Sequence, residues 1–236
     1  MNYLDLAVYL VIGVSIAIGL YSGFLSSLFN VFGMLISYAC AWLFYSYLAT
    51  WFYGHPDWID QLIHYTEGAS RLATDTARSS ITLLTIEQAR EIVAQAAMPE
   101  PFARLILDNI GNNALASQGM GTMADYFNNT VVYVSVNLIS FTMLFLILYI
   151  AFSVAISATS YVVKFPILRA FDWALGGALG LGRGIMLAMI ACSLIPIILA
   201  VLPSGIDFID EIIETSKFAP FLLDKNPILE GIRGIV

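Results

Sequence analysis

Apolar residues in this chain are gathered into long runs, separated by one long stretch in which charged residues recur. The runs cover residues 3–21, 24–52, 130–163 and 184–202. Each is close to, or longer than, the ~20 residues that an α-helix needs to cross the hydrocarbon core of a bilayer. The pattern therefore predicts four transmembrane helices.

Short breaks join these runs in pairs. Ser22-Gly23 separates the first two, which predicts a tight transmembrane hairpin over residues 1–53. The turn Lys164-Phe165-Pro166 separates the third and fourth, which predicts a second hairpin over residues 126–202. We expect Pro196 to kink the last helix, because proline lacks the N–H that a helix interior uses, and Pro203 to end it.

The third run, which begins at Thr130, is longer than a bilayer requires, so we expect it to tilt or to extend beyond the hydrocarbon core. Its hydroxyl residues are expected to bond their own helix or a neighbouring one. Asn137 is the one amide in the run, and an amide in lipid needs a hydrogen-bond partner.

Residues 54–125 contain no apolar run of spanning length, and charges recur along them. A helical stripe follows Pro56, and Thr85 with Gln88 has the spacing of a capping box that opens another amphipathic helix. A third stripe begins at Phe102, after two prolines that break the helix before it. These features predict a helical insert outside the bilayer. Residues 203–236 are read as an amphipathic, acidic tail.

Composition agrees with the membrane interpretation. Hydrophobic residues make up 59% of the 236 residues and charged residues 11%, against about 25% charged in soluble domains. The net charge of −7 and the scattered basic residues argue against a nucleic-acid partner. The predicted fold is therefore an all-α polytopic membrane protein, with the lipid bilayer as its first partner.

Glycines recur at four-residue spacing in two places. Gly176, Gly180 and Gly184 lie on one face of a helix, and a second pair falls at the end of the first run, at Gly19 and Gly23. Small residues at this spacing let two membrane helices approach closely.

Arg183 lies beside the longer glycine series, eleven positions after Asp172. An ionisable residue in an apolar segment is a functional-site hypothesis by default. The competing interpretation is that Arg183 marks the cytoplasmic end of the span.

Three motifs resemble the CvpA (colicin V production protein) family of bacterial inner-membrane proteins. They are Asn2-Tyr3-Leu4-Asp5, then Gly19-x-x-x-Gly23-Phe24, and finally Asp172-x-x-Leu175-Gly176-x-x-x-Gly180-x-x-Arg183-Gly184. The chain departs from the family in having Tyr21 and Ser22 where basic residues are common, and in its long insert. The resemblance implies four spans and a role in bacteriocin production and envelope integrity, with no catalytic reaction.

The short basic turn at Lys164 and Arg169 predicts the orientation, because short cytoplasmic loops are enriched in positive charge. This orientation places the N-terminus, residues 54–125 and the C-terminus on the periplasmic side of a bacterial inner membrane.

No motif predicts catalysis, a cofactor or a metal ion. His55 and His64 lie near two aspartates, but this spacing is more typical of a solvated helix surface than of a metal site. The leading hypothesis is a non-enzymatic membrane protein that supports bacteriocin export or production and envelope homeostasis through unidentified envelope or secretion proteins. The alternative is a small-solute channel or transporter, including a homo-oligomeric pore, with Arg183 in its pathway.

Overall fold

The computed structural model describes residues 2–66, 68–159, 171–201, 211–213 and 215–234. These residues are mostly helical, and their β-structure is limited to one isolated bridge between Ser80 and Thr122. The all-α prediction is confirmed for this part of the chain.

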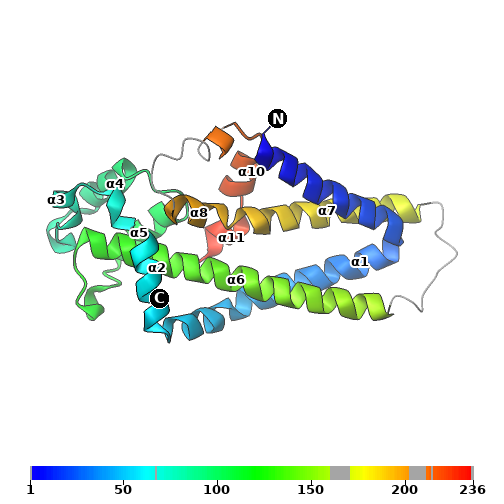
Figure 1. Ribbon diagram of the computed structural model, residues 1–236, viewed down its shortest axis with the longest axis horizontal. Coiled ribbons are helices and arrows are strands. Elements are labelled where there is room, and N and C mark those ends of the chain that lie inside the picture. Colours follow the sequence, from blue (N-terminus) through cyan, green and yellow to red (C-terminus); the bar gives the residue numbers. More distant parts are fainter. Residues whose placement is uncertain (1, 67, 160–170, 202–210, 214, 235–236) are drawn as a thin grey trace. The chain divides into compact units, whose positions relative to one another are not determined.

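In the described part of the chain, three long helices dominate, and shorter ones follow or connect them (Figure 1). The long helices are α1 (Tyr3–Tyr53), α6 (Met123–Thr159) and α7 (Asp172–Cys192). The short helices are α2 (Pro56–Thr66), α3 (Thr74–Ala77), α4 (Ile86–Gln95), α5 (Phe102–Gly111), α8 (Ile195–Val201), α10 (Ala219–Asp224) and α11 (Pro227–Gly231), with 3-10 turns η1 (Gly68–Arg71), η2 (Ile81–Leu83) and η3 (Ala116–Gln118).

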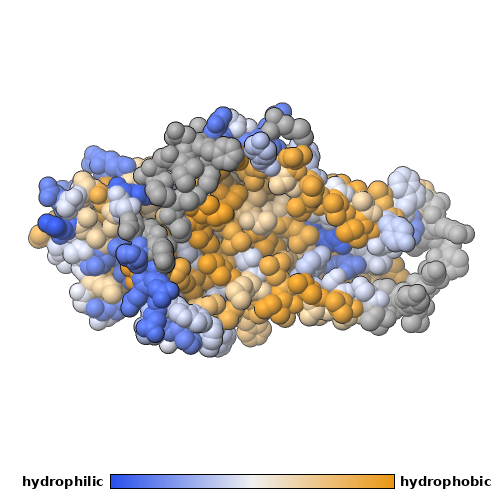
Figure 2. Space-filling view, in the orientation of Figure 1, coloured by the Kyte–Doolittle hydropathy of each residue, from blue (hydrophilic) through white to orange (hydrophobic). Residues whose placement is uncertain are grey.

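Among the described residues, three helical stretches are long and apolar enough to cross a membrane. They are Tyr3–Tyr53, Met123–Ser157 and Asp172–Ala200. Figure 2 shows the apolar surface gathered over these long helices, whereas polar surface gathers over the short helices of the insert. A helix surrounded by apolar side chains is stable in lipid because its own backbone groups are paired within the helix.

Helix α1 is interrupted at the position where the sequence predicts a break. Gly23 has φ 77° and ψ 176°, a left-handed conformation that favours glycine. The Ser27 hydroxyl donates a 3.3 Å hydrogen bond to the Gly19 carbonyl oxygen. Residues eight positions apart in a continuous helix are separated by ~12 Å along the axis. The helix axis therefore turns sharply at Gly23 (Figure 1).

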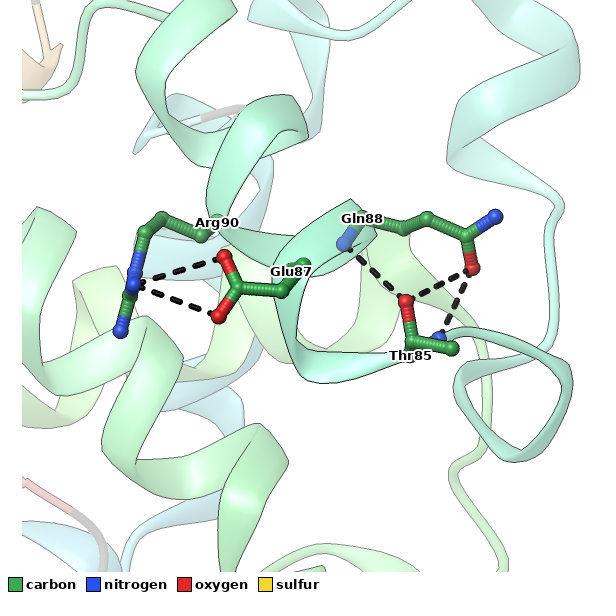
Figure 3. Close-up of polar contacts among 4 residues, drawn as sticks. All are labelled: Thr85, Glu87, Gln88 and Arg90. Atoms are coloured by element: carbon green, nitrogen blue, oxygen red, sulfur yellow. Dashed lines mark hydrogen bonds and ion pairs between the residues drawn. The ribbon is translucent and has the colours of Figure 1, made fainter.

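The predicted helices of the insert are present. The Thr85 hydroxyl accepts from the Gln88 backbone N–H while the Gln88 side chain accepts from the Thr85 N–H, which confirms the capping box at the start of α4 (Figure 3). Helix α5 begins at Phe102, after the proline break, and packs against α4.

Helix α6 begins at Met123, earlier than the apolar run that predicts it. Thr122 and Asp125 explain the difference. The Asp125 carboxylate accepts from the Thr122 N–H at 3.0 Å, and the Thr122 hydroxyl accepts from the Asp125 N–H at 3.2 Å. This reciprocal cap lets the helix start in a polar segment, which a search for apolar runs misses.

The fourth predicted span is interrupted close to Pro196, inside the apolar helical stretch Asp172–Ala200. Helix α7 ends at Cys192 and α8 begins at Ile195, so residues 184–202 do not form one helix. Pro196 lies in the first turn of α8, where its missing N–H costs nothing, and its ring excludes a continuous preceding turn. The basic turn at Lys164 and Arg169 and most of the predicted acidic helix of the tail lie outside the described residues.

The chain divides into two compact units. One comprises Met1–Ser46, Ser140–Cys192 and Ile209–Leu222, and the other Tyr47–Ile139, Ser193–Phe208 and Leu223–Val236. In the first unit, Tyr38 and Trp42 of α1 contact the ring of Phe141 edge-on. The second has a core of Ala49, Val132 and Val136. The sequence segments 1–53, 54–125, 126–202 and 203–236 remain a prediction.

Candidate functional site: the glycine contact between α1 and α7

The glycine face of α7 lies against the part of α1 that precedes Gly23. Positions on the two helices pair in opposite order, so the helices run antiparallel. The nearest neighbours are Gly184 with Ile12, Gly180 with Ser15 and Ile16, and Gly176 with Gly19 and Gly23.

These neighbours are backbone atoms, which a side-chain rotation cannot move. A Cβ on Gly180 would lie 2.5 Å from the Ser15 carbonyl oxygen and 3.0 Å from the Ile16 Cα. A Cβ on Gly184 would lie 2.9 Å from the Ile12 Cα. By contrast, nothing lies within 4 Å of a Cβ on Gly182, one residue from Arg183. The close approach of the helices therefore depends on the inner glycine series.

Asp172, at the start of α7, reaches the break in α1. Its Oδ1 accepts a 2.8 Å hydrogen bond from the Phe24 N–H. The conformation of Gly23 ends one helical segment and leaves the first N–H groups of the next without partners in the helix. Asp172 supplies the cap from a distant part of the chain. The same carboxylate occupies the space beside Gly23, so a Cβ there would displace it from this position, and the φ of 77° would strain any residue with a side chain.

Arg183 is buried, with 7% of its surface exposed. Its Nε donates to the Ser15 hydroxyl at 2.9 Å and its Nη2 to the Ser15 carbonyl oxygen at 3.2 Å. In the described part of the chain, the ion pairs are on the surface of α4 and α5 and none involves Arg183. Arg183 lies near the middle of α7, and its position relative to the bilayer remains a prediction.

The structure thus brings together all seven residues that the sequence singles out. They are Gly19, Gly23, Asp172, Gly176, Gly180, Arg183 and Gly184. Their role beyond the contact itself remains a prediction.

A family model described as colicin V production protein matches residues 4–86 and 110–227. These ranges cover most of the sequence and include every residue of the contact. The chain belongs to the colicin V production protein family. Searches against curated proteins and against solved structures gave no match.

Membership of the colicin V production family supports a role in colicin V production and a location in a membrane. The family is not a known enzyme family. No group of three or more histidine, cysteine or acidic side chains that could hold a metal ion occurs among the described residues. His55 stacks on the Trp58 ring at 4.8 Å, and its Nδ1 lies 2.9 Å from the Trp51 carbonyl oxygen.

Asp5 is a residue of the family resemblance whose role the sequence did not reveal. It is buried at 7% exposure. Its Oδ1 accepts from the Ser216 hydroxyl at 2.6 Å, from the Lys217 N–H at 3.1 Å and from the Phe218 N–H at 3.3 Å. The signal available in the sequence was an acid inside the first apolar run, but its partners lie more than 200 residues away.

Asn137 has the partners that its environment requires. The Tyr53 hydroxyl donates to its Oδ1 at 2.8 Å, and its Nδ2 donates to the Arg233 carbonyl oxygen at 2.9 Å. Other polar groups of α6 differ, because the buried hydroxyls of Ser135, Ser140 and Thr142 have no hydrogen-bond partner among the described residues.

Replacing Asp172 tests its cap on the second segment of α1. Asp172→Ala leaves the Phe24 N–H without its acceptor, so we expect the free energy of unfolding to fall by about 1 kcal/mol. Asp172→Asn keeps an oxygen in place and should lose less. Equilibrium unfolding in mixed micelles measures both, with the exposed Asp75→Ala as control. An alanine variant as stable as the wild type would show that the cap adds nothing.

Proposed function

We propose that this protein is a non-enzymatic component of the bacterial inner membrane that supports bacteriocin export or production and envelope homeostasis through protein partners. The proposal depends on the match to the colicin V production family. This match covers residues of the three long helices and part of the insert. The long apolar helices support the proposal that the protein is an integral membrane protein. The partners are envelope or secretion proteins.

Four membrane crossings fit the helices that the structure describes. The part of α1 before Gly23 has about the ~20 residues that a crossing needs, and the part after it is longer. With α6 and α7, this makes two hairpins. The basic residues Lys164 and Arg169 support a cytoplasmic turn between α6 and α7. The N-terminus, residues 54–125 and the C-terminus then face the periplasm.

The insert offers apolar side chains that the described residues leave uncovered. Leu83 is 84% exposed and Ile86 is 48% exposed, and they lie at the turn that leads into α4. Exposed apolar residues outside a membrane segment are candidates for a protein contact when they cluster. This surface is where we place partner binding.

In-membrane photo-crosslinking tests this placement. A photoreactive amino acid at Leu83 should yield one dominant adduct with an envelope or secretion protein. The control has the same photoreactive amino acid in place of Ser117, which is exposed in η3. This control should yield little adduct. A strain lacking the gene should release less bacteriocin. Normal release together with no Leu83 adduct would contradict the proposal.

A small-solute channel or transporter is the second candidate function. The observation that favours it is the burial of Arg183 without an acidic partner among the described residues. A channel formed by several copies of this chain would give crosslinks only between those copies, joined near Gly176–Gly184. It would also make solute flux in liposomes sensitive to Arg183→Gln while folding is retained. Liposomes that move no solute would remove this candidate.

A further inference from the structure

Two large aromatic side chains lie exposed where α1 ends and α2 begins. Trp51 of α1 is 52% exposed and Trp58 of α2 is 45% exposed. Tyr47, one turn before Trp51 on the same face of α1, is 74% exposed. Aromatic rings of this size contribute most to stability when they are removed from water. Their exposure here indicates a surface that another medium or molecule covers.

The packing of α2 fixes the position of Trp58. One side of α2 lies against the core of the second unit, and the residues packed there include Ile59, Leu62 and Ile63. The opposite side of the helix carries the exposed residues Asp57, Asp60 and Gln61. Trp58 lies between these two sides, at the boundary of an apolar and a polar helix face. An aromatic residue in this position suits a helix that lies along a membrane surface.

His55 holds the two indole rings in place. Its ring stacks on the Trp58 ring, with the centroids 4.8 Å apart, and its centroid lies 4.6 Å from that of the Trp51 ring. Its Nδ1 lies 2.9 Å from the Trp51 carbonyl oxygen, which can only accept, so the ring nitrogen donates. This oxygen is one of the last four carbonyls of α1, which have no partner within their own helix. The Trp51 and Trp58 rings meet edge-on at 5.6 Å. The three rings thus form one packed cluster that joins α1 to α2.

The length of the second segment of α1 places this cluster at a membrane boundary. Trp51 follows Phe24 by 27 residues, or about 40 Å along a helix. A bilayer measures about 40–45 Å when its headgroup regions are included. A segment with Phe24 at one surface therefore reaches the opposite headgroup layer at Trp51. Indole has an apolar ring and one N–H donor, and it is enriched in this layer of membranes.

From the exposed indoles, their packing on His55 and the length of the segment before them, we infer that Trp51, His55 and Trp58 anchor α2 in the headgroup layer of the bilayer. The inference rests on the membrane crossing of α1 that is part of the proposed function, and it adds that the insert begins on the membrane surface. Lipid surrounds a crossing helix up to its last turn, so the bilayer covers these rings without any further molecule. A protein partner would first have to displace that lipid. Asp57 and Asp60, on the opposite side of α2 from its packed residues, then remain in water.

Depth-dependent quenching of tryptophan fluorescence tests the anchor. In the full chain, three of the four tryptophans are replaced by phenylalanine, so that only Trp58 remains. In vesicles of phosphatidylcholine brominated at successive acyl positions, Trp58 should lie about 15 Å from the bilayer centre, at the edge of a hydrocarbon core of about 30 Å. A second variant keeps only Trp42, which should lie much nearer the centre because it precedes Trp51 by nine residues, or about 14 Å. The matched control, Ala94→Trp on the exposed side of α4 in a chain without the other tryptophans, should not be quenched.

Trp42 separates a failure of the inference from a failure of the proposed function. A deep Trp42 with a Trp58 as unquenched as Ala94→Trp would overturn the inference, leave the membrane crossing in place and assign the cluster to a protein partner. An unquenched Trp42 would contradict the crossing itself.

The unmodified chain gives a second test that does not depend on how the variants fold. A phosphatidylcholine with a photoreactive group on its headgroup should label residues 51–58 and spare α4. Equal labelling of α2 and α4 would overturn the inference.

Discussion

Gly180→Ala is expected to weaken the contact between α1 and α7. The same substitution at Gly182, a neighbouring glycine that faces outward, should weaken it less. The added Cβ would lie 2.5 Å from the Ser15 carbonyl oxygen, and both helices would have to move apart. Overpacking of this kind costs about 1–3 kcal/mol. Because Ser15 also holds Arg183, the separation would strain those hydrogen bonds as well. Thermal unfolding in detergent should show a lower midpoint.

Gly182→Ala is the matched control on the same helix. It makes the same chemical change at a position with open space, so stability should stay the same or rise slightly, since alanine favours helix over glycine. Gly180→Leu should go further and abolish assembly of the two helices. If Gly180→Ala and Gly182→Ala unfold alike, the glycine contact does not exist in the membrane.

Asp5→Ala is expected to release the segment around Ser216 from the start of α1. The carboxylate accepts from the buried Ser216 hydroxyl and from the part-buried N–H groups of Lys217 and Phe218, and the Phe218 N–H also donates to the Ser216 oxygen, so its loss removes the acceptor of the Ser216 hydroxyl and of the Lys217 N–H. A donor that loses its acceptor is costly where water cannot replace it, so we expect the free energy of unfolding to fall. The amides of Lys217 and Phe218 should exchange hydrogen much faster than in the wild type.

Two further variants separate this effect from a general loss of charge. Asp5→Asn keeps one oxygen acceptor and should give an intermediate result. Asp224→Ala removes an exposed acid from α10 and should leave exchange at Lys217 unchanged. Unchanged protection of Lys217 and Phe218 in Asp5→Ala would contradict the structural role assigned to Asp5.

Local chemistry in the sequence determined much of the secondary structure. Apolar runs of spanning length predict long helices because a bilayer demands internally paired backbone. Thr85 with Gln88 predicts the start of a helix because the two hydrogen bonds of a capping box join residues only three positions apart. The break at Gly23 was also predictable. Pro196 signalled the interruption of the last span, which falls between α7 and α8.

The glycine spacing on α7 identified a face for close packing, but not the helix that would occupy it. Only the tertiary structure showed that this partner is the first segment of α1. It also paired Asp172 with Phe24, Arg183 with Ser15, and Asp5 with Ser216, across 148, 168 and 211 residues respectively. A periodic pattern states which face of a helix is small or polar. It cannot state which distant backbone lies within 3 Å of that face, because this depends on how the whole chain packs.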